Sequence, residues 1–138
     1  MSKSYKLKDG NYIDSTGIVH NKKLLSDILS IQEGQLTVNS NYFSSIDVNK
    51  VQKQGNIVTI DFRGLVSNDI PSNTQGVLVS PYANRVSAGG STGFCFIGDR
   101  YASSAVSLWF FMFGVNIVFL PITKGKYVHL HYTYLTNN

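Results

Sequence analysis

Two histidines separated by one residue, His129 and His131, have a spacing that suggests metal chemistry. On a strand they point to the same side, as two imidazole ligands of a transition metal must. A metal site also needs a third ligand, and no cluster of cysteine, histidine or acidic residues in the sequence supplies one. The polar face of a strand is the better interpretation, and we expect neither a metal site nor a cofactor.

Two further patterns match enzyme motifs only in part. The run from Gly89 to Gly93 lacks the Gly-Lys-Ser/Thr ending and the following helix of a phosphate-binding loop, so we interpret it as a hairpin loop. Cys95 stands between Phe94 and Phe96 in a predicted strand, where a free cysteine is normally a small buried apolar residue.

Paired carboxylates would be needed for glycoside hydrolysis, and four aspartates are candidates. Nothing in the sequence selects a pair among Asp47, Asp61, Asp69 and Asp99. Asp61 shares a strand face with Arg63, which suits an ordinary ion pair. We therefore predict that the protein is not an enzyme.

Carbohydrate binding is the better supported chemistry, because it needs aromatic faces beside planar amide, carboxylate and guanidinium groups. Three predicted loops, 67–76, 81–85 and 98–101, supply such side chains. The same residues also fit ordinary polar turns, and both interpretations stay open. The candidate glycan-binding residues are Asp69, Tyr82, Asn84, Arg85, Asp99, Arg100 and Tyr101.

The elements that must position these loops include an uncharged stretch of the sequence, from Tyr101 to Thr123. Its length would allow a membrane span, but its β-branched and aromatic residues and a central Gly-Val-Asn favour a hairpin of strands 105–113 and 116–122. The first strand is apolar on both faces. One face would enter the core, and the other would need cover from another subunit, so we predict an oligomer interface at Trp109, Phe111 and Phe113.

Other segments alternate between apolar and polar residues, as half-buried strands do. Residues 56–66 place Val58, Ile60 and Phe62 on one face, and residues 126–137 alternate in the same way. Some seven or eight short strands separated by Gly, Pro and Asn predict an all-β fold. We expect a jelly-roll-like β-sandwich head formed by residues 35–138.

Residues 1–34 form a different unit, with short predicted strands around Tyr5, Tyr12 and Val19 followed by a helix over 21–32. The helix has one apolar stripe and is short, so it must dock on something. We interpret this unit as a strand–helix adaptor that helps to form a trimer, with further interface residues at Leu25, Ile28 and Leu29.

Composition limits the function classes. The 138 residues carry a net charge of +4, but the basic residues are scattered and form no stripe for nucleic acid. A charged fraction of 14% is low for a free monomer and suits a subunit of an assembly. The single cysteine and the first ten residues, which have no apolar core of a signal peptide, lead us to expect synthesis in a bacterial cytoplasm.

The segment LKDGNYIDSTGIVHNKKLLSDIL, from Leu7 to Leu29, resembles tail-fibre, baseplate and minor structural proteins of phages and prophages of Gram-positive bacteria. In that group a similar stretch, matched here by Tyr12 to Asn21, precedes a Leu-rich helix. It resembles an adaptor that leads into a C-terminal β-sandwich head. The specific part of the likeness covers about a sixth of the chain.

This resemblance implies a homotrimer in the virion tail, in contact with other tail proteins and with bacterial cell-surface polysaccharide. It implies no particular sugar-binding residue, and we expect neither nucleic-acid binding nor membrane insertion. Two alternatives remain: a purely structural tail accessory protein that binds no receptor, and a lectin-like carbohydrate-binding module.

Overall fold

A computed structural model describes residues 5–6, 11–13, 19–20, 30–86 and 91–137 of the chain. All regular structure in these residues is β-strand, which confirms the all-β prediction. The described part of the chain contains no helix long and apolar enough to cross a membrane. The strands are β1 (Tyr5–Lys6), β2 (Tyr12–Ile13), β3 (Val19–His20), β4 (Ile31–Gly34), β5 (Thr37–Val38), β6 (Phe43–Gln54), β7 (Ile57–Val66), β8 (Leu78–Val79), β9 (Ser91–Gly98), β10 (Val106–Phe113), β11 (Asn116–Phe119) and β12 (Tyr127–Leu135).

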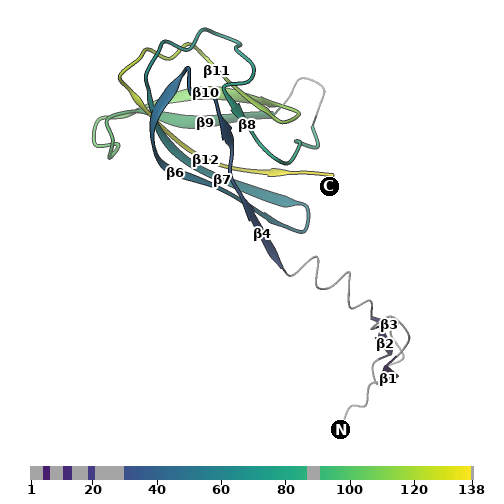
Figure 1. The fold of residues 1–138 in the computed structure, drawn as a ribbon. Helices are drawn as coiled ribbons and strands as arrows, with labels where there is room; N and C mark the ends of the chain where they lie inside the picture. Colours follow the sequence, from purple (N-terminus) through teal and green to yellow (C-terminus); the bar gives the residue numbers. More distant parts are fainter. Residues whose placement is uncertain (1–4, 7–10, 14–18, 21–29, 87–90, 138) are drawn as a thin grey trace.

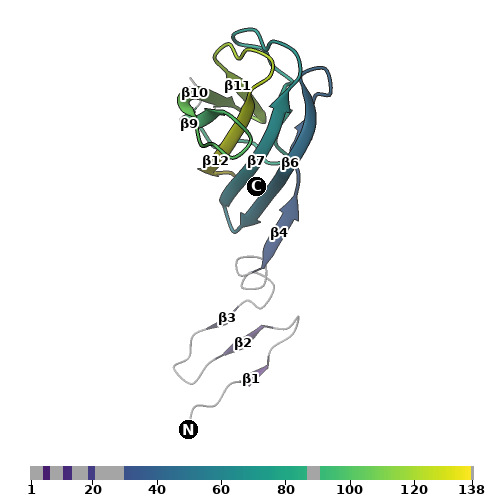
Figure 2. The same cartoon turned by 90° about the vertical axis from the view of Figure 1, so that its left-hand side faces the viewer.

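Nine strands form one antiparallel sheet in the order β4-β6-β7-β12-β9-β10-β11-β8-β5. The sheet curls into a half-barrel, so that β6 and β7 lie opposite β10 and β11 (Figures 1 and 2). The finer prediction of a jelly-roll sandwich is not confirmed, because the strands belong to one continuous sheet. Strands β1, β2 and β3 form a separate three-stranded sheet, as expected for short N-terminal strands.

The helix predicted over 21–32 lies mostly outside the described residues, as do Leu25, Ile28 and Leu29. Its last two residues are not helical, because Ile31 and Gln32 belong to β4 and pair with Gln54 and Lys53 of β6. The large sheet therefore begins at Ile31, before the boundary predicted at Gly34.

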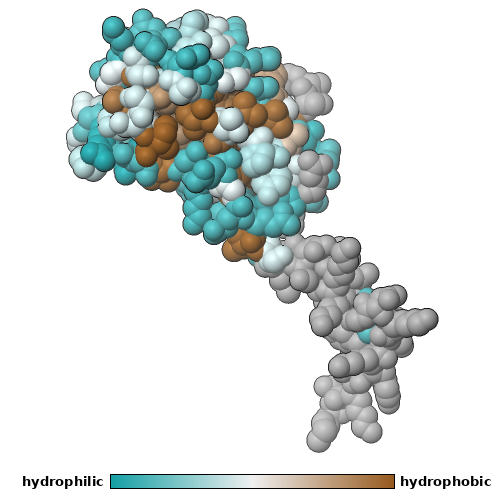
Figure 3. All heavy atoms as spheres, in the orientation of Figure 1, coloured by the Kyte–Doolittle hydropathy of each residue, from teal (hydrophilic) through white to brown (hydrophobic). Residues whose placement is uncertain are grey.

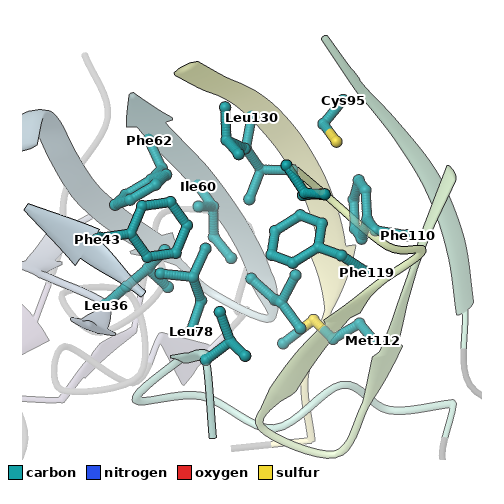
Figure 4. Close-up of a cluster of buried hydrophobic side chains, with 14 of the residues drawn as sticks. Leu36, Phe43, Ile60, Phe62, Leu78, Cys95, Phe110, Met112, Phe119 and Leu130 are labelled. Carbon is teal, nitrogen blue, oxygen red and sulfur yellow. The ribbon is translucent and has the colours of Figure 1, made fainter. Parts of the chain in front are cut away.

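The core fills the inside of the curl, where side chains from both halves of the sheet meet (Figure 4). Alternation in β7 places Val58, Ile60 and Phe62 inside, as predicted. Phe110 of β10 packs edge-on against Tyr132 of β12, with ring centroids 4.9 Å apart. Burying aromatic and aliphatic side chains of this size, at about 1.5–3 kcal/mol each, is the main stabilising term of the fold.

The uncharged stretch forms the predicted hairpin, because β10 pairs with β11 from Phe110↔Phe119 to Phe113↔Asn116. Gly114 has a φ of 57° and is the first residue of a two-residue loop. A glycine at this position fits a type II′ turn, whose twist matches that of the strands. Phe110 and Met112 point into the core and Trp109 points out, as the alternation predicts.

The edge strands β4 and β5 are separated in the chain only by Gln35 and Leu36, although they lie at opposite ends of the sheet. The Asn49 side chain of β6 holds this corner. Its Oδ1 accepts a hydrogen bond from Leu36 N at 2.8 Å, and its Nδ2 donates to Leu36 O at 2.9 Å. One amide thus satisfies both backbone groups of a residue that lies between strands.

Candidate functional site

The seven predicted glycan-binding residues do not form one site, because they lie near opposite ends of β12. Gly98, just before Asp99, pairs with Tyr127 at the start of β12. Arg85 donates its backbone N–H to the carbonyl of Leu135 at the other end, over 2.7 Å. The loop around Tyr82, Asn84 and Arg85 is therefore separate from the turn formed by Asp99, Arg100 and Tyr101.

Asn84, one of the predicted glycan-binding residues, is buried. Its backbone N–H donates to Gly114 O over 2.8 Å, its Oδ1 accepts from Val86 N over 3.0 Å, and its Nδ2 donates to the Ser91 hydroxyl. Because every polar group of the side chain has a partner inside the protein, Asn84 braces the loop and is not available to a ligand.

Other candidates in the loops also have structural partners. Asp69 accepts the backbone N–H of Lys124 over 2.9 Å, which ties two loops together. The Arg85 side chain donates to Asn137 Oδ1 over 3.1 Å. Tyr82 donates its hydroxyl to Gln32 and lies under the ammonium group of Lys53. These contacts are those expected of residues in ordinary polar turns, which is the alternative interpretation of these loops.

The turn between β9 and β10 is held in one shape by Asp99. This carboxylate accepts hydrogen bonds from the Ser103 hydroxyl over 2.5 Å and from Ser104 N over 3.0 Å, and these bonds lower the pKa of Asp99. Ala102 adopts a φ of 58°, which a residue with a Cβ seldom does. The turn therefore keeps a conformation that the chain alone would disfavour, and it presents Tyr101 with 74% of its surface exposed.

Asp47 connects this turn to the outer face of the sheet. Strand β6 shifts register between Ile46 and Val48, so Asp47 is the extra residue of a β-bulge, a feature that redirects side chains. Its carboxylate accepts two hydrogen bonds from Arg100, at 2.8 and 3.1 Å, and lies 3.2 Å from Arg63 Nε. The hydrogen bonds from Arg100, with the positive charges of both arginines, lower the pKa of Asp47.

An open groove of about 230 Å³ lies on the outer face where β12 and β9 diverge. Two exposed aromatic rings, Phe94 and Phe96, form one wall, and charged or polar groups from β7 and β12 form the other. Small-molecule sites also combine an apolar wall with a few convergent polar groups, but they usually enclose about 300–1,000 Å³, so this groove is smaller and more open than such a site. The lining residues are Val48, Asp61, Phe62, Arg63, Phe94, Phe96, His129, Leu130 and His131.

The aromatic wall continues onto β10. Phe94 packs edge-on against Trp109, with ring centroids 5.0 Å apart, and both rings remain about half exposed. Val106 is also exposed. On the opposite side of the domain, which faces the viewer in Figure 3, further hydrophobic residues gather in a band. Sequence reasoning missed Phe94 and Phe96 as functional candidates. The signal was present, because a buried Cys95 in a strand forces both neighbours to the opposite face.

The histidines form two separate contacts. His131 Nδ1 lies 2.5 Å from Asp61 Oδ1, and His129 Nε2 lies 2.7 Å from the backbone O of Asp99. The predicted Asp61–Arg63 ion pair is wrong, because Asp61 contacts His131 of β12 and Arg63 contacts Asp47 in the β-bulge. Within the described ranges, no three His, Cys, Asp or Glu side chains lie close enough together to hold a metal ion.

The predicted oligomer interface is only partly exposed. Half of the Trp109 surface is exposed, whereas Phe111 and Phe113 are less exposed than Trp109. The rings of Phe111 and Phe113 lie against each other, with centroids 6.0 Å apart. Val118, which pairs with Phe111, is almost fully buried. This chain thus covers much of the outer face of the hairpin itself, and the larger exposed apolar surface lies on β9 beside Trp109.

Cys95 is buried as predicted, and burial raises the pKa of its thiol to about 12. A thiol that stays protonated is a poor nucleophile.

Comparisons with protein-family models, curated proteins and solved structures found no match for this chain. What the site can do therefore rests on its geometry: an aromatic wall for stacking, and carboxylate, guanidinium and imidazole groups for hydrogen bonds.

Proposed function

We propose that the chain is a subunit of a homotrimeric phage tail or baseplate component whose β head recognises a bacterial cell-surface glycan. The observation that carries the proposal is the outer groove, with Phe94 and Phe96 opposite Asp61 and His131. The resemblance of Tyr12 to Asn21 to tail proteins supplies the biological setting, which is the virion and its other tail proteins.

A sugar ring fits this groove for a simple physical reason. Each ring has an apolar face of C–H groups and a rim of hydroxyl groups. The face can stack on exposed aromatic rings such as Phe96, while the hydroxyls donate to carboxylate oxygens and accept from guanidinium or imidazole N–H groups. Asp61 and Arg63 present these groups on one strand, and their backbone is fixed in the middle of the sheet.

A second candidate is a purely structural tail subunit without a receptor. The exposed apolar side chains Phe94, Val106 and Trp109 favour it, since contiguous patches of this kind also mark protein–protein interfaces. The two functions differ in one respect: a structural subunit would bury the patch in the assembly and would have no affinity for saccharides.

The test is a binding titration of the full chain with purified Gram-positive cell-wall polysaccharide. Phe96→Ala should weaken binding about tenfold, because it removes a stacking surface. The matched control is Leu135→Ala, which removes an exposed apolar side chain outside the groove and should leave binding unchanged. Absence of any saccharide binding by the unmodified chain would contradict glycan recognition and favour the structural subunit.

A further inference from the structure

Aromatic rings and one guanidinium group follow one another along the outer face, from β9 to the turn after it. Phe96 faces His129 across the β9–β12 pairing, so the stripe passes from one strand to the next. The ring centroids of His129 and Tyr127 are 6.5 Å apart. Tyr127 pairs with Gly98, so it lies beside the start of the turn that carries Arg100. The residues of this aromatic stripe, in order, are Phe94, Phe96, His129, Tyr127, Arg100 and Tyr101.

The far end of the stripe is a second exposed aromatic surface. Tyr101 is 74% exposed, and the guanidinium carbon of Arg100 lies 5.7 Å from the centre of its ring. Arg100 is fixed by its two hydrogen bonds to Asp47, which also contacts Arg63 in the groove wall. The groove and the tyrosine are thus linked through one carboxylate.

This end is also pre-organised. The turn is closed by the hydrogen bonds of Asp99 to Ser103 and Ser104, and by the bond from Ala102 N to Asp99 O at 3.1 Å. His129, from the groove lining, contacts the backbone O of the same Asp99. A binding surface that is already ordered loses less conformational entropy when a ligand arrives.

We propose that Tyr101 and Arg100 form a second saccharide subsite, so that the outer face binds an extended glycan chain rather than a single sugar. This inference rests on the proposed function and adds the class of ligand. The carboxylates of Asp47 and Asp61 balance the guanidinium groups of Arg63 and Arg100, so the face suits a chain of uncharged sugars.

The experiment compares affinities for neutral oligosaccharides of increasing length, size-fractionated from purified Gram-positive cell-wall polysaccharide. With the unmodified chain, affinity should rise about tenfold once an oligosaccharide is long enough to reach from the groove to Tyr101, and then level off. Tyr101→Ala should remove this gain. Tyr101→Phe should keep it, since the stacking surface remains.

Controls separate this inference from the function on which it rests. Phe96→Ala should weaken binding at every length, and Ile57→Ala, an exposed apolar residue outside the groove, serves as the matched control. The thermal midpoint of each variant verifies folding. Affinity independent of length, or a gain that persists in Tyr101→Ala, would overturn the second subsite while leaving the groove intact. No binding at any length would overturn both proposals.

Discussion

Two charged contacts of the outer face converge on one residue, Asp47. Its bulge places the carboxylate between Arg63, in the groove wall, and Arg100, in the turn that carries Tyr101. Arg100 is 53 positions away in the sequence, so this contact depends on the register of several strands. Nothing in the local sequence around Asp47 distinguishes it from the other aspartates, which explains why sequence reasoning could not select it.

Asp47 should make stability depend on pH in the acidic range. Its pKa is lower in the folded chain than in the unfolded chain, so its contribution is present above the unfolded pKa of about 3.9 and is lost as pH falls through the lower folded pKa. In urea unfolding, the free energy of unfolding of Asp47→Asn should therefore fall less steeply below about pH 4 than that of the unmodified chain. An unchanged acid profile would contradict the role of this ion pair.

Cys95 should be inert in the folded protein. Its thiol is buried and its pKa is raised to about 12, so alkylation by iodoacetamide at neutral pH should proceed only when the chain unfolds. The labelling rate should rise in urea in parallel with unfolding. The thiol pKa is about 8.5 in the unfolded chain and about 12 in the folded chain, so the free energy of unfolding should fall as pH rises between these two values. Cys95→Ala removes this titration, and its free energy of unfolding should therefore fall less over the same alkaline range.

At the scale of elements, regular alternation was enough to predict β7 and β12. Strand β10, which is apolar on both faces, was predicted instead from its β-branched and aromatic residues and from the Gly-Val-Asn that follows it. Alternation does not reveal β6, although this strand runs unbroken over Phe43–Gln54. Its register shifts near Ile46 break the period of two on which the prediction depends. Part of the predicted loop 89–93 also proved to be strand, since β9 begins at Ser91.

The corner between β4 and β5 should depend strongly on Asn49. Asn49→Ala removes both hydrogen bonds to Leu36, a buried residue, and should lower the free energy of unfolding by about 2 kcal/mol. Asn68→Ala is the matched control, because it removes one exposed hydrogen bond, to Asn41 O, and should cost less than about 1 kcal/mol. Equal losses in chemical denaturation would show that the corner is not held by this amide.

At the scale of the whole molecule, the sequence predicted the all-β class but not the single curled sheet. Closure of the curl depends on which strands pair across long sequence distances, such as β12 with β7, and alternation within a strand does not specify its neighbours. The candidate site shows the same limit. Arg100 and Tyr101 could be proposed from residue type, but Phe94 and Phe96 were missed, and the grouping of the site on one face required the strand order.

The trimer remains a prediction that solution mass can check. Light scattering coupled to size exclusion should give three times the 15.3 kDa mass of the chain. Trp109→Ser should weaken the assembly, because it removes a half-exposed ring from the apolar patch. A stable monomer over the working concentration range would remove the interface assigned to Trp109, Phe111 and Phe113.

The place of β12 has a consequence for the order of events during synthesis. This strand follows all the others in the chain, yet it lies in the middle of the large sheet, between β7 and β9. The two parts that it joins leave the ribosome first, each with an open edge and an incomplete core. The large sheet is complete only when β12 enters between them, so a nascent chain that ends before Tyr127 leaves the edges of β7 and β9 unpaired, and such edges favour aggregation.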